Sequence, residues 1–228
     1  MVPGVVLGVV LGDKRFGNVS TMQTFRTFVA IKLPPTVRRT LEHSADEFQC
    51  DDFSSSGGPV RWMPAENLHL TLKFLGDVDD VETASVCQIV AQTCRDISPF
   101  DLTIGQRTAL PSIAKPRTLV FAVADSSGNL TTIVDRLEKA FAAVGYRPEP
   151  RDYVPHITAA RPRGGGRRIA AELVDRWIDD PEPIDAPVSV ESVEVVASVL
   201  DKQGPTYHTL STHWLNDHAD SQSSIDQS

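Results

Sequence analysis

Cysteine is scarce in this sequence, with three among 228 residues, Cys50, Cys87 and Cys94. Three thiols cannot all pair with one another and none forms a C-x-x-C motif, so a reducing cytoplasmic location is the simplest expectation. A strong positive charge is also absent, because the formal net charge is −8. Non-specific phosphate binding needs a broad basic surface. The negative net charge therefore excludes a protein that coats nucleic acid in general, and only a local basic patch is possible.

Long hydrophobic runs are missing as well. The apolar stretch VPGVVLGVVLG at residues 2–12 is too short to span a bilayer and lacks the basic flank and cleavage site of a signal peptide. We expect residues 1–22 to be a disordered extension and the polar segment 216–228 to be a disordered tail. Residues 23–215 are then predicted to form a single bilobal domain with no membrane association.

Between these ends, one pattern occurs twice. The β-type run RTFVAIKLP (26–34) precedes a helical pattern, which is followed by NLHLTLKFLGD (67–77). The β-type run RTLVFAVAD (117–125) precedes a longer helical pattern, which is followed by DYVPHITAARP (152–162). Strand, helix and a strand with H-x-T therefore recur, which predicts a duplicated unit.

The remaining segments set the fold class. Helices are expected over 79–97, with Ala84, Cys87, Ala91 and Cys94 on one face, and over 167–178. Further strands are expected at 60–63, 100–104 and, as one long alternating strand, 188–200. We predict an α+β fold with two mainly antiparallel sheets facing a central groove, helices outside and a pseudo-twofold repeat.

The two H-x-T motifs are candidates for catalysis. Residues two apart in a strand project from the same face, so His69 and Thr71 lie side by side, as do His156 and Thr158. Two imidazoles can supply the base and the acid of phosphodiester cleavage, and threonine hydroxyls can donate to phosphoryl oxygens. A strand histidine bonded to the backbone is the ordinary alternative for one motif alone. His and Thr two apart are not a ligand pair, and neither H-E-x-x-H nor H-x-H occurs, so no metal site and no cofactor are expected.

Several longer stretches carry a family resemblance: FVAIKLP, RWMPAENLHLTLKFLGDV, KPRTLVFAV, YVPHITAAR and SVLDKQGPTYHTL. Through them the chain resembles the two-histidine phosphoesterase superfamily, and within it the RNA 2′,3′-cyclic phosphodiesterase group, also called the 2′-5′ RNA ligase group. The resemblance covers residues 25–215. It implies a bilobal sheet structure and the opening of a terminal 2′,3′-cyclic phosphate of RNA to a 2′-phosphomonoester.

The resemblance also implies roles for single residues. His69 corresponds to the general acid that protonates the leaving 3′ oxygen, and His156 to the base that activates water. Thr71 and Thr158 correspond to the residues that bind phosphate oxygens, and Arg161 to an arginine that contacts phosphate or sugar. From the residues themselves, two more substrate contacts are candidates. Tyr153 could stack on a terminal base, and Lys73 shares the face of His69 by period two.

Other functions share the same residues. A 2′-5′ RNA ligase would use the same acid and base, and a phosphodiesterase for another cyclic phosphate or nucleotide would differ only in its loops. A non-catalytic module that binds RNA ends would keep the groove without turnover. The expected partner is RNA or an oligonucleotide with a 2′,3′-cyclic phosphate end, and the expected state is a monomer with no obligate protein partner.

Overall fold

The computed structural model describes residues 24–49, 60–163, 168–179, 184, 186–200 and 205–215. The expected extension over 1–22 and the expected tail from residue 216 lie outside these residues. The strands are β1 (Thr24–Lys32), β2 (Val60–Trp62), β3 (His69–Asp79), β4 (Phe100–Leu110), β5 (Thr118–Asp125), β6 (His156–Pro162), β7 (Ala186–Val190), β8 (Ser192–Leu200) and β9 (Pro205–Trp214). The helices are α1 (Pro35–Gln49), the short 3-10 helix η1 (Ala65–Asn67), α2 (Asp80–Cys94), α3 (Asn129–Ala143) and α4 (Ala171–Asp179). In these described ranges, no helix combines the length and the apolar character needed to cross a membrane.

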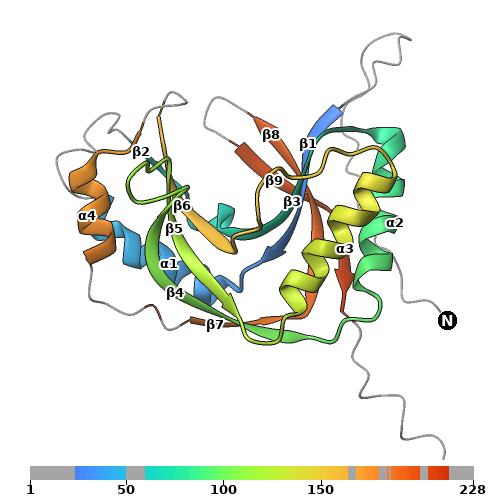
Figure 1. Ribbon diagram of the computed structural model, residues 1–228, viewed down its shortest axis with the longest axis horizontal. Coiled ribbons are helices and arrows are strands. Elements are labelled where there is room, and N and C mark those ends of the chain that lie inside the picture. Colours follow the sequence, from blue (N-terminus) through green and yellow to red (C-terminus); the bar gives the residue numbers. More distant parts are fainter. Residues whose placement is uncertain are drawn as a thin grey trace, which may run out of the picture.

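The strands form one continuous antiparallel sheet in the order β7-β4-β5-β6-β3-β1-β8-β9, with β2 paired to β6. Figure 1 shows this sheet curled into a trough with the helices on its outer side. The predicted α+β class, the antiparallel pairing and the outer helices are confirmed. Two separate sheets that face each other were expected and are not found, because β3 and β6 pair and join the two halves. The pseudo-twofold repeat stays a prediction.

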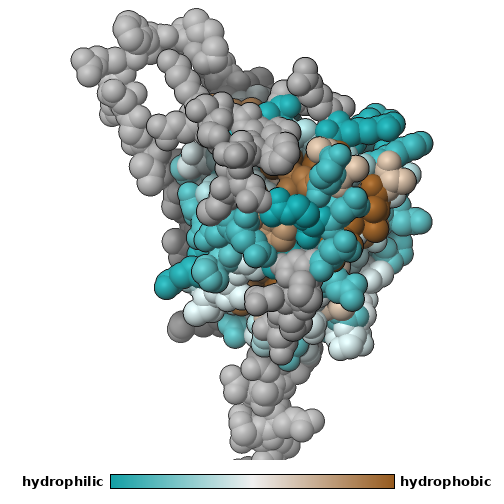
Figure 2. Space-filling view, turned by 90° about the vertical axis from the view of Figure 1, so that its left-hand side faces the viewer, coloured by the Kyte–Doolittle hydropathy of each residue, from teal (hydrophilic) through white to brown (hydrophobic). Residues whose placement is uncertain are grey.

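Apolar stripes place the helices against the outer face of the sheet. The stripe of α3 is buried at helical spacing through Leu130, Ile133, Val134, Leu137 and Phe141, as the sequence predicts. Helices α2 and α3 contact β3, β8 and β9, whereas α1 and α4 contact β7 and β4. On the side where α4 and β2 lie, the described surface is mainly hydrophilic with smaller hydrophobic areas (Figure 2). The apolar faces of the helices are therefore largely buried against the sheet.

Two predicted details are wrong. In α2 the buried face carries Val86 and Val90 beside the two cysteines, whereas Ala84 and Ala91 are exposed. The expected long strand 188–200 is divided at Glu191 into β7 and β8. Strand β7 pairs with β4 and β8 pairs with β1 and β9, so this segment crosses from one half of the sheet to the other.

Candidate active site

The two H-x-T motifs meet where β3 pairs with β6. Leu70 pairs with Ile157, and both side chains are completely buried in the core. The antiparallel register therefore sets His69 opposite Thr158 and Thr71 opposite His156 on the other face of the sheet. Directly opposite Cβ atoms lie about 4.5–5.5 Å apart and diagonal neighbours about 7–8 Å. The two imidazoles, as diagonal neighbours, have room for one phosphoryl group between them.

Each imidazole is fixed by the same local hydrogen bond. Nδ1 of His69 lies 2.7 Å from the carbonyl oxygen of Asn67, and Nδ1 of His156 lies 2.7 Å from that of Val154. A carbonyl oxygen can only accept, so Nδ1 carries the proton in both rings. Nε2 is then the nitrogen of each ring that can take up a proton and give it back.

Burial makes both rings weak bases in the unliganded protein. Burial lowers the pKa of His69 to about 4, against a raising effect of the bond to Asn67, and the charges of Arg161 and His156 lower it further. Burial also lowers the pKa of His156, the bond to Val154 raises it, and the charge of Arg161 lowers it again. Both imidazoles are therefore neutral near pH 7 before an anion binds.

The motif threonines keep their hydroxyls available. Other threonines of the chain, such as Thr27, Thr93 and Thr132, donate theirs to main-chain carbonyl oxygens. The hydroxyls of Thr71 and Thr158 make no such bond within the described residues, although both side chains are half-buried. A half-buried hydroxyl without a partner is suited to bind a ligand oxygen.

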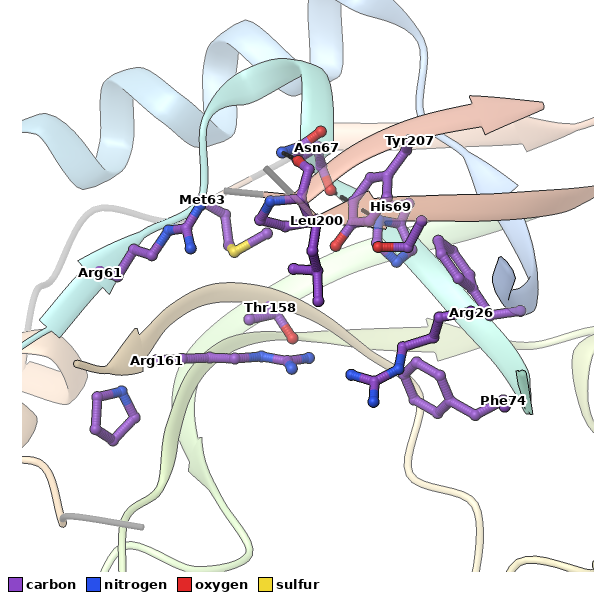
Figure 3. Close-up of a pocket in the computed structure, with 15 residues that line it drawn as sticks. Arg26, Arg61, Met63, Asn67, His69, Phe74, Thr158, Arg161, Leu200 and Tyr207 are labelled. Carbon is purple, nitrogen blue, oxygen red and sulfur yellow. Dashed lines mark hydrogen bonds between the residues drawn. The ribbon is translucent and has the colours of Figure 1, made fainter. Parts of the chain in front are cut away.

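A cavity of about 460 Å³ opens beside this cluster. Its lining includes His69, Thr158 and Arg161 (Figure 3). It also includes Arg26, Arg61 and Tyr207, for which the sequence predicted no role. His156 and Thr71 lie beside the cavity along the β3–β6 boundary and are not part of its lining. The cavity thus extends from the His69 side of the motif cluster.

Arg161 is central to the electrostatics of the site. Its charge lowers the pKa values of His69 and His156, and it opposes the effect of burial, which raises the pKa of Tyr207. Arg61 acts on Tyr207 in the same sense. A guanidinium close to both imidazoles can bind an anionic group placed between them.

Aromatic rings enclose His69. The ring of Phe28 stacks on the imidazole with centroids 4.9 Å apart and planes at 28°. The ring of Tyr207 meets the imidazole edge-on with centroids 5.2 Å apart. These rings shield the imidazole from water, which is the physical cause of its low pKa.

In addition, Asn67 donates from its side-chain amide to the carbonyl oxygen of Pro205 and so ties the chain before His69 to the start of β9.

The prediction that Lys73 shares the face of His69 is wrong. The register of β3 against β1 shifts at Leu72, which has no partner, so a β-bulge interrupts the period of two. Lys73 is turned to the helix side, where its side chain is 1% exposed and its Nζ lies 2.7 Å from Oε1 of Glu138 on α3. The bulge turns the next residue, Phe74, into the cavity instead.

The side chains of Tyr153 and Trp62 pack against the core of the protein. The Tyr153 hydroxyl donates to the main-chain oxygen of Thr71 at 3.0 Å, and its ring packs against the core, not into the cavity. Trp62 packs against the rings of Phe48 and Trp177. The stacking role considered for Tyr153 is not supported by this placement, because its ring is held in the core and its hydroxyl holds β3 in place.

A metal centre is not evident from the side chains. Among the described residues, no group of three or more His, Cys, Asp or Glu is arranged to hold a metal ion. The cluster itself offers two imidazoles for proton transfer beside an arginine and two hydroxyls.

Solved structures share this fold. The Thermus thermophilus protein TT0787 superimposes with a TM-score of 0.68 at 23% identity, covering 85% of this chain and 99% of that one. Escherichia coli LigT, in a structure with 3′-AMP, superimposes with a TM-score of 0.67 at 22% identity, covering 86% of this chain and all of that one. The curled sheet is thus the fold of LigT-like proteins.

Sequence comparison defines the family. The model of the 2′-5′ RNA ligase superfamily matches residues 27–201, and the chain belongs to that superfamily. A protein of Aeropyrum pernix named RNA 2′,3′-cyclic phosphodiesterase is 30% identical over 70% of this chain and 89% of its own length. A protein of Methanothermobacter thermautotrophicus with the same name is 28% identical over 80% of this chain and 94% of its own length.

Proposed function

We propose that this protein hydrolyses the 2′,3′-cyclic phosphate end of RNA to a 2′-phosphomonoester without a metal ion. The observation that carries the proposal is the pairing of Leu70 with Ile157, which sets the two H-x-T motifs against each other across one strand boundary. The proposal is also supported by the relatives in the same superfamily that are named RNA 2′,3′-cyclic phosphodiesterases.

The imidazoles carry the protons in the proposed reaction. Nε2 of His156 takes a proton from water, and the water oxygen forms a bond to phosphorus. The bond from phosphorus to O3′ breaks, and Nε2–H of His69 gives its proton to O3′. The low pKa of His69 makes its imidazolium a strong acid, which suits it to the donor role. A bound phosphate anion favours the charged form of this ring and so supplies the conditions for its protonation.

The charged oxygens of the phosphoryl group need donors as the reaction proceeds. The hydroxyls of Thr71 and Thr158 and the guanidinium of Arg161 are the donors we assign to them. Each position is set by regular structure, since Thr71 lies on β3 and the other two lie on β6. Donors fixed in this way need no rearrangement when charge develops on the phosphate.

The direct test uses a short RNA that ends in a 2′,3′-cyclic phosphate, incubated with the purified protein in the presence of a chelator. We expect complete conversion to the 2′-phosphomonoester. Release of the 3′-phosphomonoester would contradict the assignment of the leaving oxygen, and a requirement for added metal would contradict the two-imidazole mechanism. Joined strands from RNA with a 5′-hydroxyl partner would instead indicate the ligase reaction, and tight binding without any product would indicate the non-catalytic module.

The pH dependence follows from the lowered pKa values. The productive form carries one proton on the pair, so the rate should follow a bell-shaped curve with apparent pKa values that belong to both rings together. Both pKa values are below 6.5 in the free protein, so kcat/KM should be greatest below pH 6.5. The bound anion raises both, so kcat should be greatest at a higher pH than kcat/KM. Profiles of both constants between pH 4 and 9 check this, and a kcat/KM that still rises above pH 7 would contradict it.

A further inference from the structure

A row of aromatic rings leads away from His69 along the cavity. Phe28 stacks on the imidazole, and the ring of Phe74 follows with its centroid 6.1 Å from that of Phe28. All three side chains line the cavity. Phe74, at the end of the row, is 51% exposed. Such a ring offers a free face on which a planar ligand can stack.

The exposure of Phe74 runs against the usual distribution of side chains. The bulge at Leu72 buries the charged Lys73 and turns the apolar Phe74 towards solvent. Lysine is almost never fully buried without a partner, and phenylalanine is usually buried. Exceptions of this kind, which local preference disfavours, are expected at functional sites.

A cation lies at the same end of the cavity. Arg26 on β1 lines it, and Asp77 is its cross-strand neighbour on β3. Among the described residues, the Arg26 side chain forms no ion pair with Asp77 or with any other acidic residue. Figure 3 shows Arg26 and Arg161 extending from opposite sides of the cavity with their guanidinium groups turned towards each other. Two like charges that converge are stabilised when an anion lies between or beside them.

We propose that Phe74 and Arg26 bind the nucleotide that precedes the cyclic-phosphate nucleotide in single-stranded RNA. The base of that nucleotide stacks on Phe74, and its phosphodiester binds Arg26, while Arg161 binds the reacting phosphate beside the two imidazoles. This inference rests on the proposed function and assigns the substrate class as oligonucleotides of two or more residues. Stacking on one ring accepts any base, so the site selects for a strand and not for a sequence.

Binding measurements test the subsite without relying on turnover. Titration with a trinucleotide that ends in a 2′-phosphate, and with the matching mononucleotide 2′-phosphate, gives two dissociation constants. We expect the protein to bind the trinucleotide at least about tenfold more tightly, which corresponds to one base stack or one charged hydrogen bond. Equal affinities would overturn the inference, whatever the catalytic result. A trinucleotide preference in a protein that leaves cyclic phosphates intact would instead overturn the proposed function and leave the subsite standing.

Variants assign the preference to the two side chains. Arg26→Ala should weaken trinucleotide binding about tenfold, with a loss about fivefold larger than for the mononucleotide. It should also reduce the slope of log K against log salt concentration by about 0.7, the value for one phosphate contact on a single strand. Arg39→Ala, an exposed arginine on α1 outside the cavity, is the matched control and should change neither quantity.

Phe74 is tested by shape-matched changes. Phe74→Leu keeps an apolar side chain and removes the ring, and it should weaken trinucleotide binding about 5- to 100-fold. Phe74→Trp should retain or strengthen binding because it keeps a stacking face. Equal affinity of the leucine and tryptophan variants, with both folded by circular dichroism, would exclude a stacked base and overturn the assignment.

Discussion

Replacing either His69 or His156 with alanine should lower kcat for cyclic-phosphate hydrolysis by about 10² to 10⁴. One variant lacks the proton donor and the other the acceptor, and the proposed reaction needs both in the same transition state. The kcat of the double variant should therefore be only slightly lower than that of the slower single variant, because the effects of groups that act as a unit are not additive. Single-turnover rates on a cyclic-phosphate RNA at saturating protein measure this directly.

The matched control for these variants is His43→Ala. His43 lies on α1 with its side chain 92% exposed, so its removal takes away an imidazole without touching the β3–β6 boundary. Its kcat should equal that of the wild type. Near-normal hydrolysis by His156→Ala would end the assignment of the base. Independent losses that multiply in the double variant would mean that the two rings do not act on one phosphorus atom.

Short-range rules explain why the histidines could be found from the sequence. From His69 to Thr71 the strand keeps a period of two, and the same holds from His156 to Thr158, so each pair shares a face as predicted. The rule fails two residues later at Lys73, because a bulge depends on the register against β1 and not on the residues of β3 alone. The period of two therefore holds within each H-x-T motif, and it misplaces Lys73.

Long-range contacts explain what could not be found. Tyr207 touches the His69 ring although the two are far apart in the chain, because β9 and β3 both flank the β1–β8 pair in the curled sheet. The segment that contains Tyr207 carries part of the family resemblance, but nothing in its local pattern predicts its ring beside an imidazole. Likewise, whether the halves form one sheet or two depends on a single pairing of Leu70 with Ile157, which no local preference reveals.

The ion pair beneath β3 should contribute strongly to stability. Glu138→Gln leaves the ammonium group of Lys73 buried without a counter-charge, and we expect the free energy of unfolding to fall by about 3 kcal/mol, the lower end of the range for a broken buried pair. Lys73→Met should cost less, because the remaining carboxylate is 24% exposed and can be hydrated. Urea unfolding at pH 7 measures both values.

The double variant Lys73→Met with Glu138→Leu separates the charge from the shape. Both charges are then gone and apolar volume fills the space, so stability should return to within about 1 kcal/mol of the wild type. Asp135→Asn, an exposed change on the same helix, is the control and should alter stability by less than about 0.5 kcal/mol. A Glu138→Gln variant as stable as this control would show that Lys73 reaches water when unpaired. In that case the register of β1 and β3, and not the ion pair, would hold the Lys73 side chain on the helix side of the sheet. The ion pair would then be a consequence of the bulge that turns Phe74 into the cavity.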